Sequence, residues 1–125
     1  MTEVAAHRTR VKSLARRQKA FRADAYFFVL EALDGAMRAE EASRHISGQE
    51  LLEWIRDLGN ERFGVMAGDV FNSWGVRSTL DFGRIVFHLV EDGLLRKREQ
   101  DSLSDFIDQF DFDEAFGLKF FEGES

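Results

Sequence analysis

Apolar side chains recur at intervals of three and four residues along much of the chain, which is the period of an α-helix. Over residues 24–38 such a stripe is formed by Tyr26, Leu30, Leu33 and Met37. The adjacent Phe27, Phe28 and Val29 widen this apolar face. The pattern predicts a helix that is buried at the centre of the molecule.

The clearest helix start in the chain is Ser47-Gly48-Gln49-Glu50, which has the spacing of a capping box. A helical stripe follows it, made of Leu51, Trp54, Ile55 and Leu58. Gly59 and Gly64 are both suitable helix ends, since glycine adopts the left-handed conformation of a C-terminal cap without strain. Because Trp54 lies on the apolar stripe, we expect its side chain in the core.

Two further helices are predicted downstream. Over residues 65–74, Met66, Val70 and Trp74 repeat at every fourth position, and Gly75 ends the pattern. Trp74, like Trp54, is therefore expected in the core. A second cap, Ser78-Thr79-Leu80-Asp81, opens a helix that runs to Asp92 and stops at Gly93. Its apolar face consists of Phe82, Ile85, Val86, Leu89 and Val90.

Residues 1–22 form a basic N-terminal segment with a narrow apolar seam at Val4, Val11 and Ala15, beside Leu14. Good helix formers predict a helix here, docked loosely on the body. Seven cations face a single acid, Glu3, so the segment has a net charge of +6. These cations are Arg8, Arg10, Lys12, Arg16, Arg17, Lys19 and Arg22.

The period changes after Gly93. Residues 94–98 suit a short strand, and phenylalanines alternating with aspartates further on suit a β-hairpin. A helix over residues 103–110 is the alternative, because Phe106, Ile107 and Phe110 also fit a helical period. Residues 101–125 hold eight acids, one Lys and six Phe, namely Phe106, Phe110, Phe112, Phe116, Phe120 and Phe121.

These elements predict a mostly α fold, with four or five helices and a small C-terminal β-hairpin in winged-helix-like order. We expect a basic helical arm at 1–22, one domain at 23–116 and an acidic aromatic tail at 117–125. Residues 85–97 are similar to the recognition helix of a winged helix-turn-helix running into its first wing strand. Many unrelated sequences share that pattern, so it indicates fold more than function.

Four stretches also carry a resemblance to one family: AYFFVLEAL (25–33), HISGQELLEWIRDLGNERFG (45–64), MAGDVFNSWGVRSTLDFGRIVFHLVEDGLL (66–95) and FDFDEAF (110–116). Together they resemble an uncharacterised bacterial family of planctomycetes and verrucomicrobia, over about residues 20–116. The resemblance implies no functional residues, because the family has no assigned activity. The chain departs from the family pattern at its start, where related chains are less basic.

The composition excludes several classes of protein. The 125 residues include 44% hydrophobic residues and 13 Phe, enough to build one core. There is no Cys, which excludes disulfides and thiolate sites. The apolar runs are too short for a membrane span or a signal peptide, so we expect a cytoplasmic protein without membrane contacts.

Catalytic and metal-binding motifs are missing from the sequence. The three histidines, His7, His45 and His88, lack the i, i+4 spacing of a ligand pair. The acidic segment 105–114 lacks the calcium-binding loop and its central glycine. No nucleophile elbow or phosphate-binding glycine loop is present. We therefore expect neither metal nor cofactor, and no enzymatic activity.

The function we favour from sequence is a non-enzymatic adaptor or regulatory module that binds a protein, with the Phe-rich end as its contact surface. The alternative is a winged-helix-type regulator that binds nucleic acid. Its contacts would come from the arm (Arg8, Arg10, Lys12, Arg16, Arg17 and Lys19) and from Arg77, Arg84, Arg96, Lys97 and Arg98.

Two other roles for the arm stay open. Residues 23–125 have a net charge of −12, so the positive face of the arm could pack against its own chain. The apolar seam could instead join two copies of the chain. The partner, the pathway and the oligomeric state do not follow from the sequence.

Overall fold

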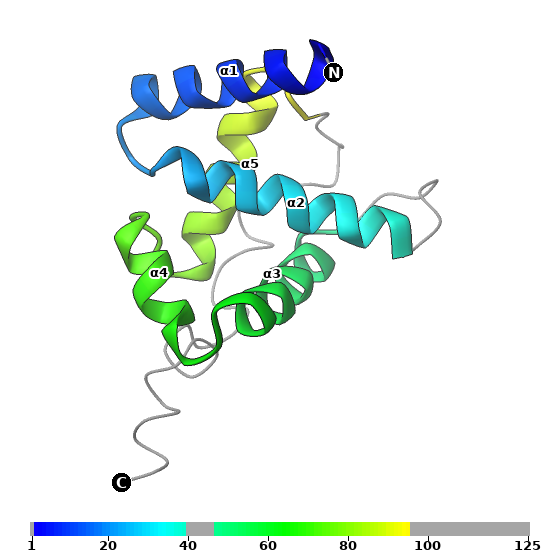
Figure 1. Ribbon diagram of the computed structural model, residues 1–125, viewed down its shortest axis with the longest axis vertical. Helices are drawn as coiled ribbons and strands as arrows, with labels where there is room; N and C mark the ends of the chain where they lie inside the picture. The colour runs from blue at the N-terminus through cyan, green and yellow to red at the C-terminus, as the bar shows by residue number, and fades with distance from the viewer. Residues whose placement is uncertain (1, 40–46, 96–125) are drawn as a thin grey trace, which may run out of the picture.

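The computed structural model describes residues 2–39 and 47–95, including the side chains from residue 8 onwards. These residues form a mostly helical fold, as predicted (Figure 1). Helix α2 crosses the middle of the molecule, with α1 on one side, α3 on the other and α5 behind it. The elements are α1 (Thr2–Gln18), α2 (Ala23–Ala39), α3 (Gly48–Phe63), a 3-10 turn (Gly64–Met66), α4 (Ala67–Ser73) and α5 (Thr79–Glu91).

Helix α2 is central, as predicted, and its buried face includes the predicted Tyr26, Phe28 and Val29 together with alanines that the prediction did not name. Its buried side chains are Ala25, Tyr26, Phe28, Val29, Ala32 and Ala36. Of the predicted stripe, Leu30 and Leu33 are half-buried and pack against the core, whereas the place predicted for Met37 is wrong because it is exposed. Three of the buried residues are alanines, whose small side chains let the neighbouring helices approach the α2 backbone.

Helix α3 begins and ends at predicted signals. The Ser47 hydroxyl accepts from the Glu50 amide at 3.1 Å, and the Glu50 carboxylate accepts from the Ser47 amide at 3.0 Å. This reciprocal pair satisfies two amides that a helix start leaves without partners. Of the two candidate ends, Gly64 is the one used, with φ +55°.

The next helix is shorter than predicted, and its apolar stripe was wrong. The chain forms a 3-10 turn before α4 starts at Ala67, which breaks the α-helical period that placed Met66 in the stripe. Ala67, Gly68 and Phe71 are buried, whereas Met66 is 51% exposed. Trp74 packs against the core, half-buried.

Phe71 joins four elements in an aromatic cluster. Its ring meets Phe28 at 5.2 Å, Trp74 at 5.4 Å, Phe82 at 5.5 Å and Phe63 at 6.0 Å between centroids. All four contacts are edge-to-face, the arrangement that aromatic quadrupoles favour. These rings come from α2, α3, α5 and the end of α4, so one side chain of α4 connects the helices around it.

Helix α5 starts after Ser78 and ends before Gly93, as predicted. The capping group differs, because the Asp81 carboxylate accepts from the Arg77 amide at 2.8 Å while the Ser78 side chain makes no capping bond in the described part of the chain. Beyond the helix, the Leu94 and Leu95 amides both donate to the Leu89 carbonyl. At these two positions the predicted strand is wrong; the rest of that strand and residues 104–112, where the hairpin was predicted, lie outside the described residues.

Helix α1 packs more tightly than predicted. Val11, Leu14 and Ala15 are buried and belong to the same core as α2 and α5. Over residues 8–22 the expected loose docking is wrong, because the seam, though narrow, presents two large side chains that are wholly covered, Val11 and Leu14. The arm and the body therefore share one core, and Val11, Leu14 and Ala15 of the seam are not available to join two copies. No helix over 2–39 or 47–95 has both the length and the hydropathy to cross a membrane.

Candidate interaction surfaces

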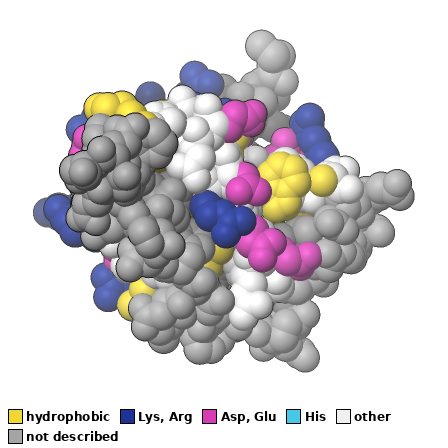
Figure 2. All heavy atoms as spheres, turned by 90° about the horizontal axis from the view of Figure 1, so that it is seen from below, with side chains coloured by type: hydrophobic (Ala, Val, Ile, Leu, Met, Phe, Trp, Pro, Cys, Tyr) yellow, Lys and Arg dark blue, Asp and Glu magenta, His cyan; other side chains and the backbone are white. Residues whose placement is uncertain are grey.

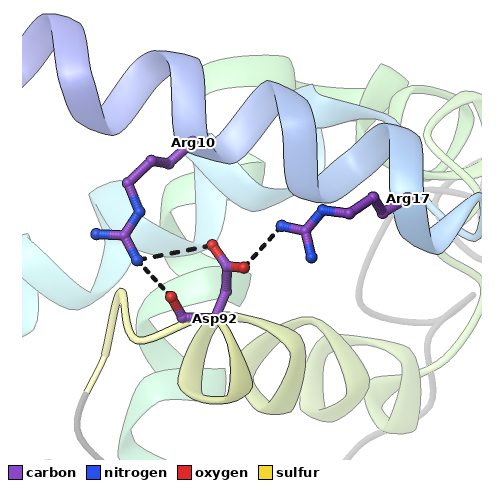
Figure 3. Close-up of polar contacts among 3 residues, drawn as sticks. All are labelled: Arg10, Arg17 and Asp92. Atoms are coloured by element: carbon purple, nitrogen blue, oxygen red, sulfur yellow. Dashed lines mark hydrogen bonds and ion pairs between the residues drawn. The ribbon is translucent and has the colours of Figure 1, made fainter.

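Two basic side chains of α1 bind the end of α5. Arg17 Nη2 lies 2.7 Å from Asp92 Oδ1 (Figure 3). Arg10 Nη2 lies 3.8 Å from Asp92 Oδ2 and also donates to the Asp92 backbone carbonyl. The Asp92 side chain is only 17% exposed. The prediction that part of the arm packs on acidic groups of its own chain is therefore confirmed for Arg10 and Arg17.

The position of Asp92 explains why it needs two cations. A carboxylate at the C-terminal end of a helix faces the negative end of the helix dipole, which is unfavourable. Arg10 and Arg17 neutralise that charge, and Arg10 also satisfies a carbonyl at the helix end. The three residues fasten α1 to α5.

Three other cations of α1 form an exposed row, which we call the basic row. Arg8, Lys12 and Arg16 follow one another at every fourth position, and all three are exposed. Side chains at this spacing are neighbours on a helix. Among the side chains of residues 8–39 and 47–95 the row has no ion-pair partner, and Lys19, just past the helix, is also exposed. The row therefore presents concentrated positive charge to solvent.

Arg84 is the residue of α5 that was predicted to contact nucleic acid, and polar side chains around it are engaged with their own chain. Asp81 binds the Arg77 amide and lies 3.3 Å from Arg84 Nη1. His88 Nδ1 lies 2.8 Å from the Tyr26 hydroxyl. Arg77 and Arg84 are exposed, but the structure does not bring them into one row with α1. Arg96, Lys97 and Arg98 lie outside the described residues.

Tyr26 and His88 form a buried polar pair between α2 and α5. Tyr26 is fully buried, which raises its pKa to about 12. Burial lowers the pKa of His88, whose ring also lies 6.1 Å from that of Phe21. The pair satisfies a hydroxyl that would otherwise be buried without a partner. The described residues contain no cluster of three potential metal ligands, and His88 serves here as a packing residue.

The surface formed by α2 and α3 holds an exposed tryptophan. Trp54 is 36% exposed, so its predicted place in the core was wrong. Its ring lies against Gly35 of α2, where an added Cβ would come within 3.1 Å of the ring atom Cζ3. Since Gly35 has no side chain, the indole covers the backbone of α2 and leaves its outer edge in solvent.

Acidic side chains gather beside Trp54. Glu53, Asp57 and Glu61 are exposed and repeat at every fourth position of α3; we call them the acidic row. Figure 2 looks onto the side of the molecule where α3 lies and shows acidic groups around exposed hydrophobic atoms. Asp57 lies 3.4 Å from Arg56 Nε, a contact between neighbours that leaves the carboxylate 72% exposed.

Arginines neutralise only part of this surface. Both terminal nitrogens of Arg62 on α3 donate hydrogen bonds to the Glu31 carboxylate on α2. These bonds lower the pKa of that carboxyl. Arg38 lies 3.1 Å from Asp34 on α2. Across α3 and the second half of α2, six carboxylates face three arginines, so this surface, which we call the Trp54 face, is negative.

The predicted phenylalanine surface lies elsewhere in the chain. Phe106, Phe110, Phe112, Phe116, Phe120 and Phe121 are outside the described residues. Sequence reasoning missed the Trp54 face, because it assigned Trp54 to the core. The available signal was the i, i+4 spacing of Glu53, Asp57 and Glu61 next to that tryptophan.

Comparisons with family models, with curated proteins and with solved structures found no match to this chain. The resemblance to the bacterial family therefore stays a prediction, and function has to be argued from the surfaces themselves.

Proposed function

We propose that the chain is a non-enzymatic adaptor or regulatory module that binds a protein partner through the Trp54 face. The observation that carries this proposal is the exposed indole, held in place over Gly35. Tryptophan is enriched among the residues that dominate binding energy at protein interfaces. A large apolar group inside a charged rim is also the common anatomy of such interfaces. The Phe-rich end remains a predicted second part of the contact surface.

The test is a comparison of three forms of the full chain as bait in extracts of cells that express it. Wild type, Trp54→Ala and Met66→Ala are compared, Met66 being a more exposed apolar side chain outside the Trp54 face. We expect a protein that co-purifies with wild type and Met66→Ala and falls at least tenfold with Trp54→Ala. Equal recovery with all three forms would contradict the proposal.

A second candidate function is nucleic-acid binding, as a regulator of winged-helix type. The basic row supports it, because exposed cations without local partners are available to phosphates. Two facts weigh against it. Arg10 and Arg17 are already neutralised by Asp92, and the polar side of α5 binds its own chain. We therefore rank it below protein binding.

Fluorescence anisotropy with random-sequence DNA and RNA over a salt series tests the second candidate. Wild type is compared with Arg8→Gln/Lys12→Gln/Arg16→Gln, which removes the row without shortening the chain. If the row binds phosphates, the triple variant should weaken binding and reduce the slope of log affinity against log salt by about 3. No binding at low salt, or an unchanged slope, would remove this candidate.

A further inference from the structure

The basic row and the acidic row share one spacing. Arg8, Lys12 and Arg16 on α1 repeat as i, i+4, i+8, and so do Glu53, Asp57 and Glu61 on α3. Each row is exposed and spans eight residues, or about 12 Å along its helix axis. The two rows therefore match in length and carry opposite charge.

The two rows do not meet within one chain. Helices α1 and α3 lie on opposite sides of α2 (Figure 1). The cations of α1 that do bind their own chain, Arg10 and Arg17, bind Asp92 at the end of α5. As far as residues 8–39 and 47–95 are concerned, both rows are exposed and open to another molecule, with Asp57 contacting only its neighbour Arg56 among the ion pairs found there.

We propose that the basic row of one copy docks on the Trp54 face of a second copy. This inference rests on the proposed function, since it names the occupant of the same surface. Cations of the row would pair with the acids of α3, which repeat at the same spacing. The apolar stems of these side chains would cover the indole edge.

The proposed contact joins two different surfaces of the chain. Each copy would donate its basic row to one neighbour and accept a basic row from another, so the contact is heterologous and produces rings or open chains. Exposed ion pairs are individually weak and are screened by salt. Assembly should therefore grow with concentration and fall as salt is raised.

The experiment is sedimentation equilibrium of the full chain, treated with nuclease, from about 1 μM to about 0.5 mM at ionic strengths of about 0.02 and 0.5 M. Two variants neutralise one row each: Arg8→Gln/Lys12→Gln/Arg16→Gln and Glu53→Gln/Asp57→Asn/Glu61→Gln. We expect wild type to grow beyond the 14.4 kDa monomer at low salt and each variant to stay monomeric. Mixed in equal amounts, the two variants should form a dimer and stop there, because only one productive contact remains.

A further pair of variants separates the contribution of the Trp54 indole to assembly from the contribution of the charged rows. Trp54→Ala leaves every charge in place and should weaken wild-type assembly about tenfold, whereas Met66→Ala should leave it unchanged. A wild type that stays monomeric at 0.02 M ionic strength, or variants that do not complement each other, would overturn the inference.

The outcomes also separate this inference from the proposed function. A monomeric wild type whose cellular partner is still lost on Trp54→Ala would leave protein binding standing and remove the second copy as occupant. Row-dependent assembly with no Trp54-dependent partner would establish self-association in place of an adaptor. Loss of assembly in the basic-row variant alone, without loss in the acidic-row variant, would also overturn the inference.

Discussion

Gly75 occupies a position where two chain turns meet. Its φ is +94°, and an added Cβ would lie 2.8 Å from the Ala20 carbonyl oxygen. The neighbouring Trp74 carbonyl accepts from the Arg22 amide at 3.0 Å, so the turn after α1 and the turn after α4 are bonded together. Because the Ala20 carbonyl is part of the backbone, a rotamer change cannot make room for a side chain at position 75.

We predict that Gly75→Ala lowers the free energy of unfolding by about 2–3 kcal/mol, measured by urea denaturation. Gly64→Ala is the matched control, since Gly64 also has positive φ but has no atom within 4 Å of an added Cβ. The strained backbone alone, with φ +55° and ψ −132°, should cost that variant about 1–2 kcal/mol. Equal losses in the two variants would show that the contact with Ala20 is unimportant.

The Tyr26–His88 pair predicts how stability depends on pH. Burial lowers the pKa of His88, with Glu91 opposing and Arg84 adding to the effect. The unfolded chain then binds a proton more readily than the folded chain, so stability should fall as pH drops below about 6.5. The raised pKa of Tyr26 sets a limit at high pH. Because the tyrosine ionises at lower pH in the unfolded chain than in the folded chain, stability should fall above about pH 10.

Urea midpoints between pH 5.5 and 7.5 test the histidine. Wild type should lose stability towards pH 5.5 relative to His88→Gln, a variant that keeps a hydrogen-bonding group near Tyr26 but does not titrate. The comparison cancels contributions from other groups that titrate in this range. Parallel pH profiles for the two proteins would contradict the assignment.

Helix ends were predictable in this chain, whereas the buried faces of the helices were less so. Ser47, Gly64 and Gly93 act through local hydrogen bonds and backbone conformation, which the sequence contains in full. The buried face of α2 depends instead on which neighbours pack around it. Ala36 is buried where Met37 was expected to be, because small residues let adjacent helices come close.

At the scale of elements, Asp92 is the link between α1 and α5. Asp92→Asn should lower the free energy of unfolding by about 1 kcal/mol, since two cations lose a largely covered carboxylate. It should also speed hydrogen exchange in α1 more than in α3. Asp24→Asn serves as the control, because the Arg22–Asp24 pair is well exposed on both sides and should contribute almost nothing. An equal increase in hydrogen exchange in all the helices would contradict a specific link between α1 and α5.

Across the whole molecule, the sequence identified the charged residues but not their arrangement. The cations of the arm can be read from the sequence, yet the division between Arg10 and Arg17 on one side and the basic row on the other depends on where Asp92 lies in three dimensions. Trp54 was misplaced for the same reason. Its exposure follows from Gly35 on another helix, a contact that periodicity along one helix does not contain.

The place of α1 in the core leads to a last prediction. Val11, Leu14 and Phe21 are buried, and covering each such side chain contributes about 1.5–3 kcal/mol, which together is comparable to the whole stability of a small domain. Deleting residues 1–22 should therefore abolish the cooperative thermal transition seen by circular dichroism. The Arg8→Gln/Lys12→Gln/Arg16→Gln variant should keep that transition, because its three side chains are exposed.

If the shortened chain instead melted cooperatively near the wild-type midpoint, α1 would be a separate arm and its buried contacts with α2 would carry little energy. If it unfolds as expected, any loss of binding on truncation reports the loss of the fold and says nothing about the basic row. Phosphate binding and self-association both depend on side chains that point away from the core. Charge-neutralising substitutions, which keep Val11 and Leu14 in place, are therefore the experiments that can assign a role to α1.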